Sequence, residues 1–374
     1  MKLLRSGLSL MLAGSGVICM TASVSPSWAA TSSATTAAAV VVPPGVTAGI
    51  AVFDRQTGQF TDVINPDLQF RSASVVKLLL VLDFLWNRGP EYTIPAADKA
   101  RLEVMLRSSD DDAASYYWDS LGGTAIINRM VTRLGLTHTA GPPATHPGFW
   151  GYAAFTAADT VRIYRYLLDQ APAPVRDFVM GNLHQSTRFG TDGFDQYFGI
   201  ASVFNPGFAL KQGWSGFPSS SGFGQDKSKP KQAAVDLTSE ALHTTGTVGS
   251  GDRTIVAVYT LHPNGTGYGK AYTDVTRLTR TLNVPGGAKT PGSWLTTSGS
   301  GVRVRTAPNT TGGILGTLPA GVDVLVGCQK KGQLISTPSR SSEWWAYLPK
   351  YNGYVTNVYV GTSGAKLPGV PDCP

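Results

Sequence analysis

The chain has 374 residues, of which 42% are hydrophobic and 15% are charged, and its formal net charge is +7. This length is too great for one ordinary domain and suits two, with enough interior for a sizeable core. The composition is that of a globular protein, and lysine and arginine form no dense cluster of the kind that binds nucleic acid.

The N-terminus has the pattern of a secretory signal peptide over residues 1–29. Lys2 and Arg5 supply the positive charge, residues 8–20 are apolar, and small residues flank a plausible cleavage point near Ala29. The apolar run is too short to span a bilayer as a helix. Residues 30–44 are rich in Thr, Ser, Ala, Val and Pro and are predicted to form a flexible leader. We therefore expect a secreted, extracellular protein without a membrane span, and association with the cell wall is a further expectation.

Cys19 raises an alternative for this segment, because an exported protein can be lipid-anchored through a cysteine near its N-terminus. Ile18 argues against the alternative, since it stands where a lipoprotein signal has a small residue. The prediction is a cleaved signal.

Residues 45–285 contain one strand, several helices, and then a strand and a closing helix. The apolar spacing predicts a strand at 47–53, helices at 72–86, 96–107, 113–121 and 156–168, a strand at 254–261 and a helix at 271–282. This order predicts an α+β, three-layer domain in which helices pack on an antiparallel sheet.

The character of the sequence changes after residue 285. Residues 286–298 are rich in Pro, Gly, Ser and Thr and are predicted to be a linker. Short runs of alternating residues follow at 302–305, 322–326 and 354–360, separated by Gly, Pro and Asn. Residues 299–374 are therefore predicted to form a small all-β module.

A serine and a lysine lie three residues apart at the start of the second predicted element. Ser74 and Lys77 would share one face of a helix, where the helix dipole acts on the serine. A desolvated lysine can have a lowered pKa and accept the serine proton. Alone, this spacing is common, and Ser74 could equally cap the helix.

Two further segments, which follow in order along the chain, strengthen the interpretation that Ser74 and Lys77 form a catalytic pair. Ser109-Asp110-Asp111 opens a predicted helix, and Lys211-Gln212-Gly213-Trp214 follows an apolar run. Ser-x-x-Lys, Ser-Asp-Asn and Lys-Thr-Gly occur in this order in class A β-lactamases and penicillin-binding proteins. Residues 45–285 thus resemble the class A β-lactamase-related serine hydrolases, especially the exported actinobacterial type.

The resemblance implies a role for each matching residue. Ser74 would be the acylated nucleophile, Lys77 its proton partner, and Ser109 a relay to the leaving group. Substrate contacts would come from Asp111, Lys211, Gly213 and Trp214, with Lys211 as a cation for a substrate carboxylate. The backbone N–H groups of Ser74 and Trp214 would form the oxyanion hole.

The chain departs from the family pattern at three places. Asp111 replaces the usual Asn, adding negative charge near Lys77, and Gln212 replaces Thr or Ser. No glutamate occurs between Glu103 and Glu240, so the loop at 146–152 lacks the carboxylate with which class A β-lactamases deacylate. These departures argue against an efficient β-lactamase.

The C-terminal segment resembles bacterial SH3 domains. The resemblance rests on the 302–308 and 314–318 segments, on Trp344-Trp345 and on 353–355, and implies a small barrel that often binds cell wall or peptide. At least one of the two tryptophans is expected to fill the core. Cys328 and Cys373, the cysteines left after signal removal, most simply form one disulfide.

Three functions follow as hypotheses. The first is a serine hydrolase forming an acyl-enzyme on a cell-wall peptide or a related amide or ester, without a cofactor or metal. The second is a class A-like β-lactamase, and the third is a non-catalytic cell-wall-binding protein on the same fold. The expected partner is peptidoglycan or another wall polymer, nucleic acid is not expected, and the protein is expected to be a monomer.

Overall fold

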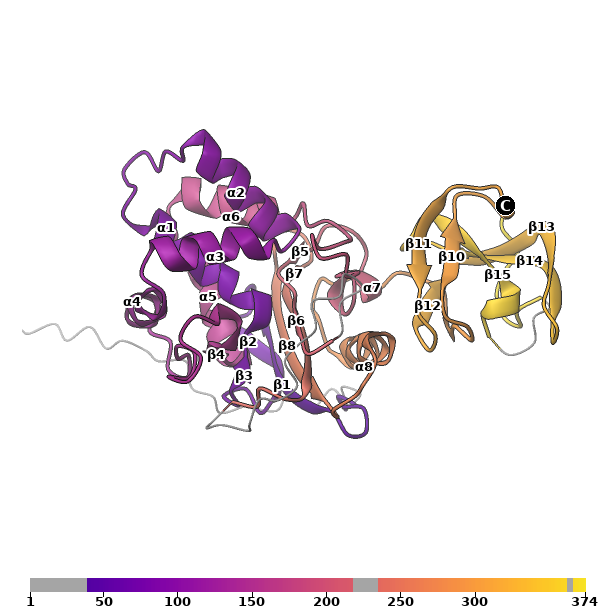
Figure 1. The fold of residues 1–374 in the computed structure, drawn as a ribbon, viewed down its shortest axis with the longest axis horizontal. Helices are drawn as coiled ribbons and strands as arrows, with labels where there is room; N and C mark the ends of the chain where they lie inside the picture. The colour runs from indigo at the N-terminus through magenta and orange to yellow at the C-terminus, as the bar shows by residue number, and fades with distance from the viewer. Residues whose placement is uncertain (1–38, 218–234, 362–365) are drawn as a thin grey trace, which may run out of the picture. The chain divides into compact units, whose positions relative to one another are not determined.

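The computed structural model describes residues 39–217, 235–361 and 366–374 (Figure 1). The predicted signal peptide and residues 30–38 of the predicted leader lie outside this part of the chain. Within the described ranges, no helix combines the length and the apolar character that a membrane crossing requires.

One antiparallel sheet organises residues 47–262. Its strands are β1 (Thr47–Asp54), β2 (Gln59–Ile64), β5 (Ala209–Leu210), β6 (Gly213–Ser215), β7 (Glu240–Val248) and β8 (Thr254–His262). The strand order is β2-β1-β8-β7-β5, and β6 also pairs with β7. Because β1 pairs with β8 along its whole length, the two ends of this region are held side by side.

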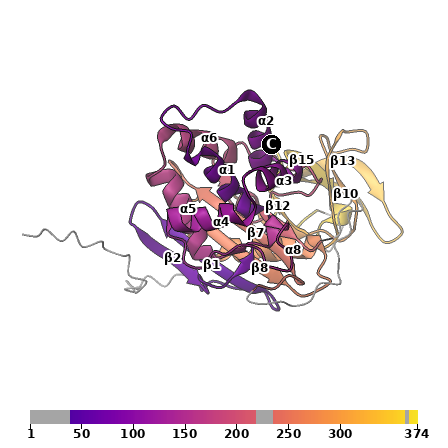
Figure 2. The same cartoon turned by 60° about the vertical axis from the view of Figure 1, so that its left-hand side comes forward.

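Helices surround the sheet. They are α1 (Lys77–Trp86), α2 (Ala96–Arg107), α3 (Asp111–Ser120), α4 (Thr124–Leu134), α5 (Ala157–Asp169), α6 (Ala173–Leu183), α7 (Ile200–Val203) and α8 (Tyr268–Thr281). Figure 2 shows α5 and α8 lying against the strands.

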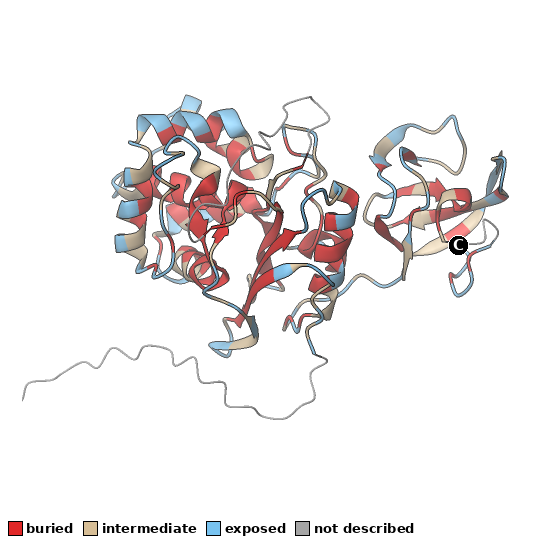
Figure 3. Cartoon of the chain, turned by 60° about the horizontal axis from the view of Figure 1, so that its bottom comes forward, coloured by how far each residue is buried: buried red, intermediate tan, exposed pale blue. Residues whose placement is uncertain are grey.

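The central strands β1, β8 and β7 are buried on both faces, and they are drawn in red in Figure 3. Along β8 the side chains alternate, so Ala257 packs in the same core as Val161 of α5, while Val258 packs with Leu278 of α8. Two apolar layers therefore enclose the strands. The expectation of an α+β domain with helices on an antiparallel sheet is confirmed.

The structure contains elements in this region that the apolar spacing did not predict, among them β2, β7, α4 and α6. Strand β7 is the clearest case, because it is fully buried although Thr and His make up much of it. Its polar groups are hydrogen-bonded: the Thr245 hydroxyl donates to the Lys211 carbonyl, and the Thr244 hydroxyl accepts from the Ile200 N–H. A strand whose buried polar groups are hydrogen-bonded can contain many polar residues. It then lacks the alternation of apolar residues by which strands are predicted.

The C-terminal β module consists of residues 293–361 and 366–374. Strands β11 (Ile314–Leu318), β10 (Val302–Arg305), β15 (Gly353–Thr356), β14 (Ser341–Leu348) and β13 (Cys328–Ser336) form one sheet in that order, and β12 (Asp323–Val326) pairs with β9 (Ser293–Thr296). The expectation of a small all-β region is confirmed. Strand β9 lies within the residues predicted as linker, and a 3₁₀ turn at Asn357–Tyr359 follows β15 in place of a longer strand.

The two adjacent tryptophans of β14 have different environments, as alternation along a strand requires. Trp345 is 2% exposed, and its indole Nε1–H donates to the Gln333 carbonyl at 2.9 Å. Trp344 is half-buried on the other face. The expectation that one of them fills the core is confirmed for Trp345.

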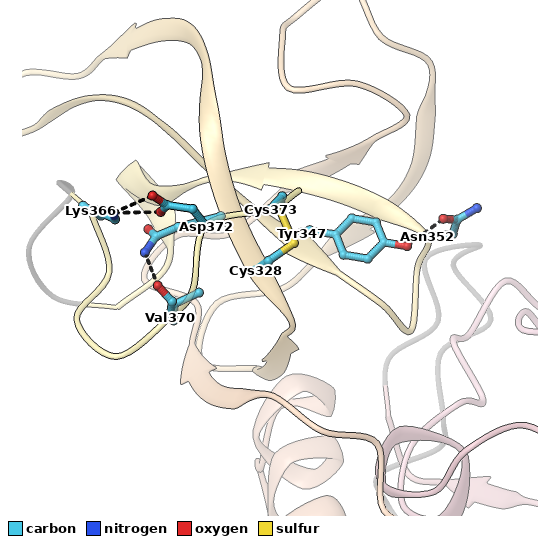
Figure 4. Close-up of a disulfide and its surroundings, with 8 residues drawn as sticks. Cys328, Tyr347, Asn352, Lys366, Val370, Asp372 and Cys373 are labelled. Atoms are coloured by element: carbon cyan, nitrogen blue, oxygen red, sulfur yellow. Dashed lines mark hydrogen bonds and ion pairs between the residues drawn. A yellow bond between two sulfur atoms is a disulfide. The ribbon is translucent and has the colours of Figure 1, made fainter.

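Cys328 and Cys373 form a disulfide that ties the end of the chain to β13 (Figure 4). Backbone hydrogen bonds join the same segments, since the Cys373 N–H donates to the Gln329 carbonyl at 2.8 Å. The buried Gln329 amide also donates to the Leu367 and Val370 carbonyls at 2.8 Å. The disulfide thus closes a loop within the β module, as predicted.

We predict that replacing both cysteines, in Cys328→Ser/Cys373→Ser, destabilises the β module by about 4 kcal/mol, because the bond closes a loop with a sequence separation of 45 residues. Calorimetric unfolding of the oxidised full-length protein and of the variant measures the difference. Reduced wild-type protein is the control and should match the variant. An unchanged unfolding profile would contradict the prediction.

Candidate active site

Ser74 lies where a short strand turns into a helix. Strand β3 (Phe70–Arg71) pairs with β4 (Ala154–Phe155), and the chain then enters the 3₁₀ turn η1 (Ala73–Val76), which continues into α1. Ala73 has φ +44°, a left-handed conformation that non-glycine residues rarely adopt. The turn leaves Ser74 6% exposed, next to Lys77 as the spacing predicts.

Lys77 is fully buried, and each of its ammonium protons has an acceptor. Its Nζ donates to Ser74 Oγ at 2.9 Å, to the Ser109 carbonyl at 2.6 Å and to Asp111 Oδ1 at 2.6 Å. The Ser109 hydroxyl is slightly farther, at 3.3 Å. The predicted nucleophile and its lysine are thus in direct contact, and an acidic side chain completes the set.

Ser109 lies between two lysines. It precedes α3 and has φ +57°, a left-handed conformation that its loop imposes. Lys211, which follows β5, is 1% exposed and its Nζ donates to Ser109 Oγ at 2.8 Å. Because Lys77 Nζ contacts the same hydroxyl, one serine oxygen connects both buried amines. Segments distant in sequence meet at this point.

Burial lowers the pKa of both lysines. For Lys77 the loss of hydration is the largest cause, and the Asp111 carboxylate acts in the opposite direction. The pKa of Lys211 lies well below its ordinary value, because of burial first and of the Lys77 charge second. The site therefore keeps two amines in an environment that disfavours two positive charges.

The acidic residues at the start of α3 have different surroundings. Asp110 is the N-cap of α3, where its carboxylate accepts from the Ala113 N–H at 2.7 Å. Asp111 extends its carboxylate to Lys77, although the Asp111 side chain remains 66% exposed. The substitution of Asp for Asn therefore places a charge in direct contact with the site lysine.

Strand β6 passes close to the serine turn because of Gly213. A Cβ atom at Gly213 would lie 3.0 Å from the Ser72 carbonyl, so a side chain there would force the strand away. The neighbouring Trp214 is half-buried, and its indole Nε1–H donates to Asp192 Oδ2 at 2.8 Å. Both predicted residues thus lie beside η1.

Gln212 faces away from the serine. It is 1% exposed, and its amide donates to the Gln196 and Phe198 carbonyls at 3.0 Å each and accepts from the Thr245 N–H. Its contacts hold the segment before α7 against the sheet. The long Gln212 side chain, at the position where the family pattern has Thr or Ser, therefore fits in the protein interior with its amide group hydrogen-bonded.

Trp150 covers the remaining side of Lys77. It begins the 3₁₀ turn η2 (Trp150–Tyr152), and its ring centroid is 4.8 Å from Lys77 Nζ, within cation–π range. Its Nε1–H donates to the Ser115 hydroxyl of α3 at 3.2 Å. The stretch that lacks a glutamate therefore places an aromatic ring against the lysine. Sequence reasoning noted these aromatics without assigning them a contact.

Asp192 is a site residue that sequence reasoning missed. It lies in the loop between α6 and α7, next to Trp214, and its charge raises the pKa of both Lys77 and Lys211. The sequence signal at Thr191-Asp192-Gly193 is that of an ordinary turn.

A buried arginine supports β6 from the other side. Arg71 of β3 is 1% exposed, and its guanidinium donates to the carbonyls of Ser215, Asp236 and Ser239. Burial lowers its pKa to about 10. The end of β6 is thus tied to the strand that leads into Ser74.

The structure brings together Ser74, Lys77, Ser109, Asp111 and Lys211, with Gly213 and Trp214 beside them. The disulfide lies elsewhere, in the β module. Among the described residues, no three His, Cys, Asp or Glu side chains are grouped as metal ligands. The functional groups that meet at this site are hydroxyls, amines and a carboxylate.

The chain is similar to curated mycobacterial proteins over part of its length. It is 38% identical over 175 residues to the protein named "Putative lipoprotein LppW" in Mycobacterium tuberculosis and in Mycobacterium bovis. The match covers 46% of this chain and 54% of LppW, so the chain spans about half the length of these relatives. No protein-family profile matches the sequence.

Solved structures with a similar backbone include a penicillin-binding protein and β-lactamases. PBP-A is 16% identical with a TM-score of 0.47, and the similarity covers 65% of this chain and 90% of PBP-A. A class A β-lactamase from Mycobacterium abscessus is 17% identical with a TM-score of 0.46, covering 63% of this chain and 92% of the enzyme.

A further match covers a shorter stretch. Over 85 residues the chain is 32% identical to the "Uncharacterized protein YraI" of Bacillus subtilis, which corresponds to 21% of this chain and 71% of YraI. Over that stretch, the chain belongs to the same family as YraI.

Proposed function

We propose that this chain is an exported serine hydrolase or acyltransferase that forms an acyl-enzyme at Ser74 on a cell-wall peptide or a related amide or ester. The observation that carries the proposal is the continuous contact from Ser74 Oγ through Lys77 Nζ and Ser109 Oγ to Lys211 Nζ. A nucleophile linked to buried amines in this way has a route for losing its proton.

The proposed acylation uses these groups in order. Ser74 Oγ attacks the substrate carbonyl while its proton enters the network of Lys77, Ser109 and Lys211. The same network returns a proton to the leaving nitrogen or oxygen, and Ser109 would deliver it. The backbone N–H groups of Ser74 and Trp214 would stabilise the oxyanion.

The surroundings of Lys77 favour a long-lived acyl-enzyme. Hydrolysis needs a water molecule beside the ester and a base to activate it. The Lys77 amine, which lies beside Ser74, already contacts the Trp150 ring, the Asp111 carboxyl group and the Ser109 carbonyl. These contacts leave little room for a water molecule next to the amine. We therefore favour transfer or slow hydrolysis over the rapid turnover of a β-lactamase.

One observation favours a second candidate, a non-catalytic wall-binding protein. The Lys77–Asp111 ion pair at 2.6 Å favours the charged lysine, which cannot act as a base.

In either case we propose that the β module is an SH3-type domain that holds the protein near the wall. The wall location is supported by the resemblance of 299–374, and export is supported by the lipoprotein name of the mycobacterial relatives.

We predict that a fluorescent penicillin or an activated ester adds covalently to the wild-type protein, and that the adduct disappears in Ser74→Ala, because that variant lacks the attacking hydroxyl. Intact-protein mass spectrometry measures the adduct. Ser72→Ala, which removes a nearby buried hydroxyl outside the amine network, is the matched control and should retain labelling. Absence of any Ser74 adduct in wild-type protein would favour the non-catalytic candidate.

We predict that Trp150→Ala shortens the lifetime of the acyl-enzyme by about tenfold, because water gains access to the space that the ring fills beside Lys77. The measurement is the decay of the penicillin adduct after removal of free reagent. Trp150→Phe keeps a ring over the amine and should decay at nearly the wild-type rate. An equal lifetime in all three proteins would mean that Trp150 does not exclude the hydrolytic water.

A further inference from the structure

Two fully buried lysines share one serine hydroxyl at this site. Ser109 Oγ is 2.8 Å from Lys211 Nζ and 3.3 Å from Lys77 Nζ. Two ammonium groups this close repel each other, and burial removes the water that would screen them. The site therefore favours one protonated and one neutral amine. Which lysine carries the charge depends on their partners.

The partners of Lys77 are those of an ammonium ion. An ammonium group has three donors and no acceptor. Lys77 Nζ has the Asp111 carboxyl group at 2.6 Å, the Ser109 carbonyl at 2.6 Å and the Ser74 hydroxyl at 2.9 Å. A protonated Lys77 has no lone pair, so it cannot accept the Ser74 proton until it has given up one of its own, and Ser109 Oγ, at 3.3 Å, is the neighbouring oxygen that can take it.

Lys211 has different partners. Within the described residues, its Nζ forms no ion pair, and Ser109 Oγ is its hydrogen-bond partner. The charged and titratable groups that face it are Lys77 of α1, Asp111 of α3 and Asp192 of the loop before α7. Burial and the Lys77 charge together outweigh the two carboxylates and hold the pKa of Lys211 well below its usual range. Tyr164 of α5, next to the Lys211 backbone, is a neutral phenol because burial raises its pKa.

Resting on the function proposed above, we infer that Lys211 is the terminal acceptor of the Ser74 proton and that Lys77 is a charged relay. The resemblance implied instead that Lys211 is a permanent cation for a substrate carboxylate. The Asp111 carboxylate, which is absent from the family pattern, is what exchanges the two roles.

The proton transfers balance. The Ser109 hydroxyl gives its proton to the Lys211 Nζ lone pair and takes one from the Lys77 ammonium. Lys77, now neutral, takes the proton of Ser74 as Oγ bonds to the substrate carbonyl carbon. Lys77 and Ser109 end as they began, while Lys211 becomes an ammonium and Ser74 becomes an acyl ester. As the substrate C–N or C–O bond breaks, Lys211 returns a proton through Ser109 to the departing atom.

The inference predicts how the acylation rate depends on pH. Acylation needs neutral Lys211, so its rate rises as the pH increases through the lowered pKa of Lys211 and then levels. Asp111→Asn removes the charge that holds the proton on Lys77, so Lys77 can then also act as a base.

Lys211→Arg tests the inference, because arginine keeps the positive charge but cannot accept a proton near neutral pH. The probe is p-nitrophenyl acetate, a neutral ester without a carboxylate, so loss of carboxylate binding cannot explain an effect. We expect Ser74 acylation of the full-length protein, followed by mass spectrometry, to slow by about 10²-fold or more. The double variant Asp111→Asn/Lys211→Arg should recover at least about tenfold. Acylation of Lys211→Arg at the wild-type rate would overturn the inference.

A second measurement on wild-type protein covers the case in which Lys211→Arg does not fold. Lysine labelled with ¹³C at the ε carbon gives one NMR signal for each side chain, and each signal reports the charge of its own amine. We expect Lys211 to titrate at a lower pH than Lys77, and the reverse order would overturn the inference. This titration is independent of labelling at Ser74. If no probe acylates the wild-type protein, the proposed function is contradicted. The NMR titration would still show which of the two lysines loses its proton at the lower pH.

Discussion

The ion pair between buried Lys77 and Asp111 is the contact on which the chemistry that we propose for the site depends. A lysine without access to water loses its proton unless a negative group stabilises the charge. Asp111, at 2.6 Å, is that group, and its exposed side chain retains part of its own hydration. The pair places the Lys77 amine directly against Ser74 Oγ. In the mechanism that we propose, the protonation of Lys211, the role of Ser109 and the reactivity of Ser74 all depend on the charge of Lys77.

The fold supplies the geometry that holds the pair in place. Lys77 comes from α1, Asp111 from the first turn of α3, and Lys211 from the chain just after β5, so three separate segments converge. Ala73 and Ser109 both adopt left-handed backbone conformations next to the reacting groups. Such conformations cost about 1–3 kcal/mol each and persist only where the surrounding structure holds them. The sheet and the helices packed on it provide that support.

The neighbours of the serine determine what can reach it. Gly213 allows β6 to approach η1 closely, and the Trp150 ring lies against the Lys77 amine. Trp214 is fixed by Asp192 at the side of β6. Ser74 therefore contacts Lys77, and the other neighbours of the Lys77 amine are protein groups. In the function that we propose, this arrangement holds the acyl group.

The sequence by itself determined the order of the site segments and the division into an α+β region and an all-β region, since Ser-x-x-Lys spacing, apolar periodicity and turn residues are local signals. The pairing of Cys328 with Cys373 followed from counting cysteines. Only the tertiary structure decided which side chains touch. Local pattern could not show that Gln212 points into the interior, that Asp110 caps α3 while Asp111 reaches Lys77, or that Trp150 covers the amine. These contacts join segments far apart in the chain, and their partners are selected by packing and by the need to satisfy buried polar groups.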